Sequence, residues 1–193
     1  MEIKNIEKID TKCMYKIYDD WPNIASESYN KKYDKIDVKD IDHIVFAGMG
    51  GSGSIGDTIS TILSKKNIHV TNVKGYLLPK TVDSKTLVIG TSVSGNTAEV
   101  LTILRDAKKT NSKVVGFSSG GLFEKYCKEN KIFFQNISMV HSPRASFTNF
   151  LYAILNILEP VLPIKKSDIQ ESIKSLNKTK ENIFSGNLTD ENR

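Results

Sequence analysis

Residues 43–57 read HIVFAGMGGSGSIGD, a short apolar run followed at once by a turn rich in glycine and serine. Residues 43–47 have the length and the apolar content of a buried strand. After the turn, isoleucines recur at positions 55, 59 and 62, a spacing that places them on one face of a helix. A strand, a glycine turn and an amphipathic helix in direct succession predict the first half of a βαβ unit.

The same alternation continues to about residue 158. Short apolar or β-branched runs predict further strands at 68–73, 87–89, 113–117 and 132–134. Amphipathic stretches predict further helices around 98–105, 122–127 and 146–158. Strands that alternate with helices in this way predict an α/β fold with a parallel sheet covered on both faces. Aromatic residues at loosely helical spacing before residue 40 predict one or two additional N-terminal helices.

Two prolines, Pro160 and Pro163, follow the last of these helices and predict a stiff connector. Beyond it, apolar residues predict one long amphipathic helix whose apolar face needs a partner: Ile169, Ile173, Leu176 and Ile183. The length of 193 residues exceeds the prior of roughly 150 residues for one domain. We therefore expect residues 1–160 to form one domain, and residues 161–193 to be a linker and the first helix of an incomplete second domain.

Composition and charge argue against several classes of protein. Hydrophobic residues make up 39% and charged residues 25% of the chain, which is ordinary for a globular domain. No apolar run approaches the ~18 residues of a membrane span, and the N-terminus has no signal-like apolar region, so we expect a cytoplasmic protein without membrane contact. The net charge is +5, but the lysines are scattered, which predicts a solvated surface and no nucleic-acid partner. Cys13 and Cys127 lack the spacing of a zinc site and are expected to be reduced thiols.

The glycines at positions 48, 50 and 53 satisfy the pattern GxGxxG, which is typical of dinucleotide-binding turns. That site also requires an acidic residue about 20 positions later, and residues 71–74 read TNVK. A Walker A loop is excluded because no GK[ST] follows the glycines. A nicotinamide or flavin cofactor is therefore the weaker alternative, and the turn favours another phosphate-bearing ligand.

A second turn, residues 90–97, reads GTSVSGNT and again lies between a strand and a helix. Ser92, Ser94 and Thr97 bring three hydroxyls to a helix N-terminus, where unpaired N–H groups favour an anion. The alternative is helix capping, with Asn96 at the N-cap and Glu99 three residues later. Because both turns follow strands of one parallel sheet, they should meet at its carboxyl edge. This placement predicts hydroxyls that bind phosphate.

Two further segments are less decisive. The turn at 118–121, SSGG, either lines the same edge or only connects a strand to a helix. Arg144 lies in the loop before the helix at 146–158, and its guanidinium suits a phosphate or a developing oxyanion. An ion pair with a surface carboxylate is the alternative for Arg144. His141, in the same loop, is interpreted as a loop or packing residue.

Together these motifs resemble the SIS (sugar isomerase) family, specifically its bifunctional phosphoglucose/phosphomannose isomerase branch. The motifs are GMGGSG at 48–53 with GD at 56–57, SVSGNT at 92–97, SGG at 119–121 and PRA at 143–145. The resemblance covers about residues 40–160. It implies a doubly wound five-stranded parallel sheet flanked by helices, a flavodoxin-like three-layer sandwich. It also makes residues 161–193 the start of a second SIS domain.

The resemblance further implies aldose–ketose isomerisation of a 6-phosphosugar to fructose 6-phosphate through an enediolate, as a step of glycolysis and gluconeogenesis. The implied roles are phosphate binding by Ser52, Ser92, Ser94 and Thr97, contact with the sugar by Gly51, and stabilisation of the enediolate by Arg144. It implies no metal, no other cofactor and a homodimer. Preference for glucose or mannose stays open.

The chain departs from the family's pattern in two ways. Val93 stands where this branch often has tyrosine. The family's general-base glutamate, ring-opening histidine and late lysine lie in a second half without a counterpart here. Proton transfer between two carbons requires a carboxylate or an imidazole within reach of both. We therefore expect a phosphosugar-binding domain that lacks the acid–base residues, and the alternative is a non-catalytic, regulatory SIS module that binds sugar phosphates.

Overall fold

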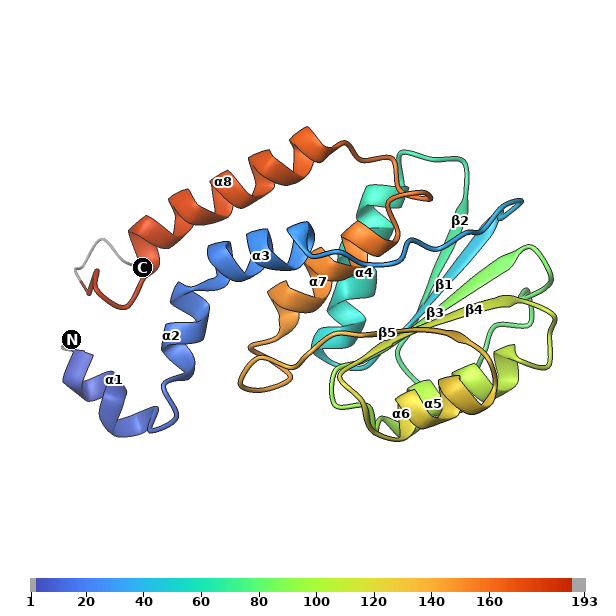
Figure 1. Ribbon diagram of the computed structural model, residues 1–193, viewed down its shortest axis with the longest axis horizontal. Coiled ribbons are helices and arrows are strands. Elements are labelled where there is room, and N and C mark those ends of the chain that lie inside the picture. Colours follow the sequence, from blue (N-terminus) through green and yellow to red (C-terminus); the bar gives the residue numbers. More distant parts are fainter. Residues whose placement is uncertain (1–2, 189–193) are drawn as a thin grey trace.

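The computed structural model describes residues 3–188, and its centre is a single sheet in which all neighbouring strands are parallel (Figure 1). The strands are β1 (His43–Ala47), β2 (His69–Val73), β3 (Thr86–Ser92), β4 (Lys113–Ser118) and β5 (Phe133–Asn136). Their order is β2-β1-β3-β4-β5, so the winding reverses between β1 and β3. The predicted doubly wound five-stranded sheet is confirmed.

Helices cover both faces of this sheet (Figure 1). On one face lie α4 (Gly51–Leu63) and α7 (Phe147–Ile157), and on the other lie α5 (Ala98–Ala107) and α6 (Gly121–Glu129). The core is divided accordingly into two clusters, one around Phe150 and one around Phe123. Strands β1 and β3 are buried along their whole length, as expected for central strands with helices on both sides.

The N-terminal segment forms three short helices among the described residues, where one or two were predicted. They are α1 (Ile3–Ile9), α2 (Met14–Asp19) and α3 (Trp21–Asn30). Cys13 has a φ of 54°, a left-handed conformation that separates α1 from α2. Pro22 lies in the first turn of α3, where its missing N–H costs nothing, so a new helix begins there. Helix α3 packs against α7.

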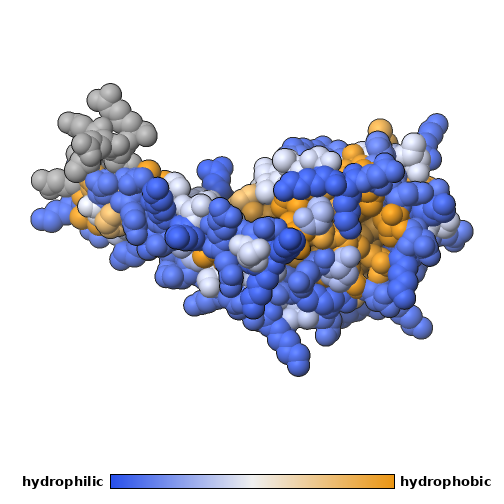
Figure 2. All heavy atoms as spheres, turned by 90° about the horizontal axis from the view of Figure 1, so that it is seen from above, coloured by the Kyte–Doolittle hydropathy of each residue, from blue (hydrophilic) through white to orange (hydrophobic). Residues whose placement is uncertain are grey.

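The last helix, α8 (Lys166–Ile183), finds a partner within the chain. It lies along α3 (Figure 1), and Ile169 is buried in the same core cluster as residues of α3 and α7. After the helix, the Ser185 N–H donates to the Asp19 carboxylate over 3.0 Å. Figure 2 shows a mostly hydrophilic surface at the end of the molecule formed by α8 and the N-terminal helices, with hydrophobic side chains gathered over the α/β body. The division of the chain near residue 160 stays a prediction.

Residues 3–188 contain neither a candidate membrane span nor a candidate metal site. No helix there is long and apolar enough to cross a membrane. No group of three or more His, Cys, Asp or Glu side chains there could hold a metal ion. Cys13 and Cys127 are both free thiols, as predicted, and burial raises the pKa of Cys127 to about 12.

His43, at the start of β1, is a buried titratable group. Its Nε2 lies 3.0 Å from the Thr71 hydroxyl, and its ring centroid is 4.6 Å from that of His69. Burial, and then the neighbouring His69, lower the pKa of His43 below its usual 6.5, while a backbone hydrogen bond at Thr81, and then Asp42 and Asp83, oppose the shift. Below about pH 6.5 the unfolded chain therefore binds more protons at this position than the folded chain. Stability should fall as the pH drops through this range.

We expect His43→Gln to reduce the loss of unfolding free energy between about pH 7.5 and about pH 5.5, because this substitution removes the buried titrating group. Urea denaturation at several pH values measures the effect. His69→Gln, at the more exposed partner, is the comparison. An unchanged pH dependence in His43→Gln would show that other groups cause the acid sensitivity.

Candidate functional site

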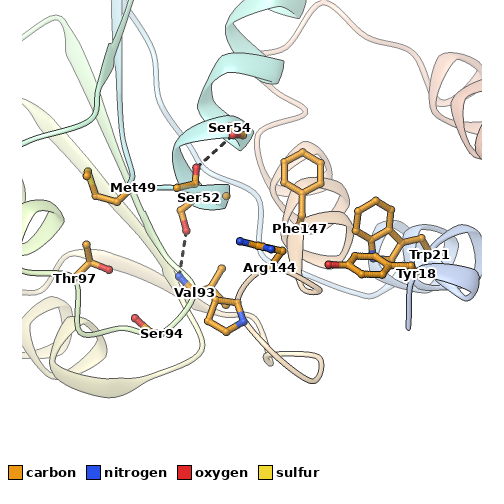
Figure 3. A pocket seen from close by; sticks show the side chains of 13 residues that line it. Tyr18, Trp21, Met49, Ser52, Ser54, Val93, Ser94, Thr97, Arg144 and Phe147 are labelled. Carbon is orange, nitrogen blue, oxygen red and sulfur yellow. Dashed lines mark hydrogen bonds between the residues drawn. The ribbon is translucent and has the colours of Figure 1, made fainter. Parts of the chain in front are cut away.

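A cavity of about 750 Å³ opens at the carboxyl edge of the sheet, beside the switch point between β1 and β3 (Figure 3). It is formed by the turn after β1 with the start of α4, the turn after β3, the loop before α7 with the start of α7, and helices α2 and α3. Its lining residues are Tyr18, Trp21, Met49, Gly50, Gly51, Ser52, Ser54, Val93, Ser94, Thr97, Pro143, Arg144 and Phe147. Five of the six predicted site residues are therefore in one place.

The first turn brings the end of β1 very close to the start of α4. A Cβ on Gly48 would lie 2.7 Å from the backbone carbonyl carbon of Ser52, so only glycine permits this approach. The N-cap position of α4 is Gly50, and no side chain caps the helix. Gly51 and Ser52 line the cavity from the first turn of this helix. The N–H groups of Ser52 and Gly53 donate to the Met49 carbonyl over 3.1 and 3.3 Å, so at this end of α4 the Gly51 N–H and the helix dipole are available to an anion.

In the second turn, the three predicted hydroxyls have different positions. Ser94 is exposed and Thr97 is half-buried, and both line the cavity. Ser92 is only 1% exposed and is not among the lining residues. Its Oγ lies 2.8 Å from the Thr97 Oγ1 and accepts a hydrogen bond from the Gly95 N–H over 3.1 Å. In this structure Ser92 therefore stabilises the turn from its buried side and does not face the cavity.

The interpretation of Asn96 as the cap of the following helix is wrong. The N-cap of α5 is Thr97, and its hydroxyl contacts Ser92 instead of the helix. The Asn96 Oδ1 accepts a hydrogen bond from the Leu122 N–H over 3.2 Å, which ties this turn to α6. No side chain caps α5. A second helix therefore presents an uncapped N-terminus beside the same cavity.

The third turn, residues 118–121, braces the second. The Ser119 hydroxyl donates to the Val93 carbonyl over 2.6 Å, and the Phe123 N–H donates to the Gly95 carbonyl over 2.9 Å. None of these four turn residues lines the cavity. Of the two possibilities that the sequence left open, a supporting connection is the one observed.

A hydrogen bond also joins the first two turns. The Val93 N–H donates to the Ser52 Oγ over 3.4 Å (Figure 3). Val93 is 4% exposed and lines the cavity. A direct contact therefore links the two turns.

Arg144 lies in a loop that the buried Ser146 holds closed. The Ser146 Oγ accepts from the Val140 N–H over 2.8 Å and donates to the Ser142 carbonyl. The Arg144 side chain is exposed, extends toward Ser52 in Figure 3, and forms no ion pair with a carboxylate of residues 3–188. The alternative of a surface ion pair is not observed, and the positive charge faces the cavity.

The aromatic side of the cavity was not predicted from the sequence. Tyr18 and Trp21 come from the N-terminal helices, and Phe147 comes from the start of α7. The Trp21 Nε1 donates to the Ala145 carbonyl over 3.0 Å, next to Arg144. No local motif connects residues this far apart in the chain. The only signal is the run of aromatic residues before position 40, which by itself indicates helices that pack against the rest of the chain.

Arg144 is the only charged side chain among the described residues that line the cavity, and no carboxylate or imidazole is among them. The Ser52, Ser94 and Thr97 hydroxyls and two uncapped helix N-termini complete the polar side. This combination can bind a dianionic group such as a phosphate ester. Within the described lining, it offers no group that could abstract a proton from carbon.

A family model described as the SIS domain matches residues 38–153 of the chain. Two curated relatives are named bifunctional phosphoglucose/phosphomannose isomerase. The chain is 33% identical over 153 residues to the one from Caldicellulosiruptor bescii, and the match covers 76% of the chain and 44% of the relative. It is 32% identical over 149 residues to the one from Thermoplasma volcanium, which covers 77% of the chain and 46% of that relative.

A solved structure has a similar fold. The C-terminal domain of glucosamine-fructose-6-phosphate aminotransferase from Francisella tularensis superposes with a TM-score of 0.62 at 19% identity, over 88% of this chain and 54% of that one. At this identity the likeness concerns the fold alone. The chain spans about half the length of the curated relatives that it matches.

Proposed function

The chain belongs to the SIS domain family, and from this premise we propose that it is the phosphosugar-binding domain of a glucose-6-phosphate/mannose-6-phosphate isomerase. One observation carries the proposal. The Ser52, Ser94 and Thr97 hydroxyls and two helix N-termini without a side-chain cap converge on one cavity with Arg144, which forms no ion pair within residues 3–188. The names of the curated relatives favour a sugar phosphate as the ligand.

In the proposed complex, the phosphate lies against the second turn. Ser94 and Thr97 donate hydrogen bonds to it, and the α5 N-terminus adds its unpaired N–H groups. The Ser52 hydroxyl and the Gly51 backbone contact the ligand from the first turn. Ser92 acts by holding Thr97 in position through the 2.8 Å contact between their hydroxyls.

Isomerisation places two demands on the site. Moving a proton between C1 and C2 creates negative charge on oxygen, which the Arg144 guanidinium would stabilise. The step also requires a base, and none is present in the described lining. We propose that the whole enzyme supplies this base from a second SIS domain, which begins after residue 160. We further propose that the whole enzyme is a cytoplasmic homodimer that uses no metal or cofactor.

Calorimetry with fructose 6-phosphate tests the binding. We expect Ser94→Ala and Thr97→Ala each to weaken the affinity roughly 2–10-fold, because each loses one hydrogen bond worth about 0.5–1.5 kcal/mol. Thr102→Ala is a matched control on α5, where the hydroxyl donates to the Ala98 carbonyl and not to the cavity. Equal affinities in all three variants would contradict the proposed site.

The alternative function is a non-catalytic module that senses sugar phosphates, which the lack of a base in the described lining favours. It predicts the same binding. A coupled assay that follows conversion of fructose 6-phosphate separates the two. Turnover by the chain alone, lost in Arg144→Ala, would support an isomerase, whereas binding without turnover fits both the module and a domain that needs a further region.

A further inference from the structure

The cavity has two chemically different sides. Hydroxyls and helix N-termini form one side. The other is an aromatic wall, which we define as Tyr18, Trp21 and Phe147 (Figure 3). A phosphate requires only the polar side, so the proposed phosphate site leaves the wall without a role.

The aromatic wall is a packed unit. The rings of Tyr18 and Trp21 meet edge to face at a centroid distance of 4.9 Å, and the rings of Trp21 and Phe147 are 6.3 Å apart. All three side chains are half-buried, so each keeps part of its surface open. Edge-to-face packing restricts ring rotation. The wall is therefore a preformed surface.

Several contacts fix the wall relative to Arg144. The Trp21 Nε1 donates to the carbonyl of Ala145, the residue after Arg144. The His141 Nε2 lies 2.9 Å from the Lys12 carbonyl, and the Ser142 hydroxyl lies 3.6 Å from the Met14 sulfur. The segment leading into α2 and the loop that carries Arg144 are thus joined along their length. A ligand bound by Arg144 would have the aromatic wall at a fixed position beside it.

Tyr18 contributes a polar group as well as its ring. In Figure 3 its hydroxyl is directed toward the side of the cavity where Arg144 lies. Its hydrogen-bond partner in the structure is the Met14 sulfur at 3.9 Å, a long contact with a weak acceptor. This hydroxyl can therefore exchange its present contact for a ligand oxygen at little cost.

We propose that the aromatic wall binds the carbon skeleton of the sugar and gives the site its preference for a hexose phosphate over bare phosphate. The C–H groups on one face of a sugar form an apolar surface that packs on aromatic rings, and its hydroxyls accept or donate hydrogen bonds at the edge. Tyr18 supplies both kinds of contact. This inference rests on the proposed phosphosugar binding and assigns the sugar-specific side of that site.

Trp21 is the only tryptophan of the chain, so its fluorescence reports directly on the aromatic wall. We expect fructose 6-phosphate to change this emission in a saturable way, and inorganic phosphate to compete with it while changing the emission much less. The affinities of Tyr18→Phe and Tyr18→Leu for the two ligands are then compared by calorimetry. Tyr15→Phe is the matched control on the same helix, because its hydroxyl faces Glu7 and not the cavity.

We expect Tyr18→Leu to weaken fructose 6-phosphate binding at least about fivefold and Tyr18→Phe about two- to threefold, while both change phosphate binding less than about twofold. Ser94→Ala should weaken both ligands alike. If the wild-type chain bound fructose 6-phosphate but both Tyr18 variants kept its preference over phosphate, this inference alone would be overturned. If the wild-type chain bound neither ligand, the proposed function would fail with it.

Discussion

Gly95→Ala is expected to lower the free energy of unfolding by about 3 kcal/mol or more and to remove phosphosugar binding. Gly95 has a φ of +72°, and a Cβ there would lie 1.9 Å from the carbonyl oxygen of Gly120. The Gly120 oxygen belongs to the backbone and the added Cβ is fixed to the backbone of residue 95, so no side-chain rotation can relieve the clash. The second turn and the third turn would have to separate, and Ser94 and Thr97 would move with them. Urea denaturation and calorimetry with fructose 6-phosphate measure the two losses.

Two other glycines separate the causes of this effect. Gly50 has a φ of +53° and a ψ of −127°, but a Cβ added there would have no neighbouring atom within 4 Å, so Gly50→Ala should cost only the backbone strain of about 1–3 kcal/mol. Gly75 has no positive φ, and a Cβ added there would have no neighbouring atom within 4 Å, so Gly75→Ala should change the free energy of unfolding by less than about 0.5 kcal/mol. If all three variants had equal stability, the contact between the second and third turns would have no energetic importance.

The fold was predictable because its signals are local. The strands follow from short apolar or β-branched runs, and the glycine turns after β1, β3 and β4 each mark the point where a strand ends and a helix begins. Right-handed parallel crossovers then leave few possible arrangements. The break between α1 and α2 was not predicted, because Cys13 adopts a left-handed conformation that its residue type does not favour. The partner of α8 was also missed, since periodicity identifies an apolar face but not the surface that covers it.

The part of the candidate site that lies in the two glycine and serine turns was predictable from the sequence. The positions of Ser52, Ser94 and Thr97 follow from the carboxyl edge of a parallel sheet. The side chain of Asn96 was misjudged because its partner, the Leu122 N–H, belongs to the next helix along the sheet. The aromatic wall depends on the packing of α2 and α3 beside α7, and no short motif encodes a contact such as that between Trp21 and Ala145, 124 positions apart.

Arg144→Ala should weaken fructose 6-phosphate binding roughly 10–100-fold, the largest loss of affinity expected from one exposed side chain. A hydrogen bond to a charged group is worth about 1.5–3 kcal/mol, and a guanidinium can make two to one phosphate. Because Arg144 is exposed and has no carboxylate partner among the described residues, its removal leaves no buried group unpaired. Stability should therefore stay within about 0.5 kcal/mol of the wild type.

Arg105→Ala tests whether this loss is specific, because it changes the net charge by the same amount. Arg105 lies on α5 with its guanidinium 5.8 Å from the centre of the Tyr126 ring and does not line the cavity. A general electrostatic attraction would weaken similarly in both variants and would disappear at high salt. A direct contact predicts a large loss in Arg144→Ala alone, and only partial recovery in Arg144→Lys, since lysine keeps the charge but not the planar fork. Similar losses at the two positions would remove Arg144 from the site.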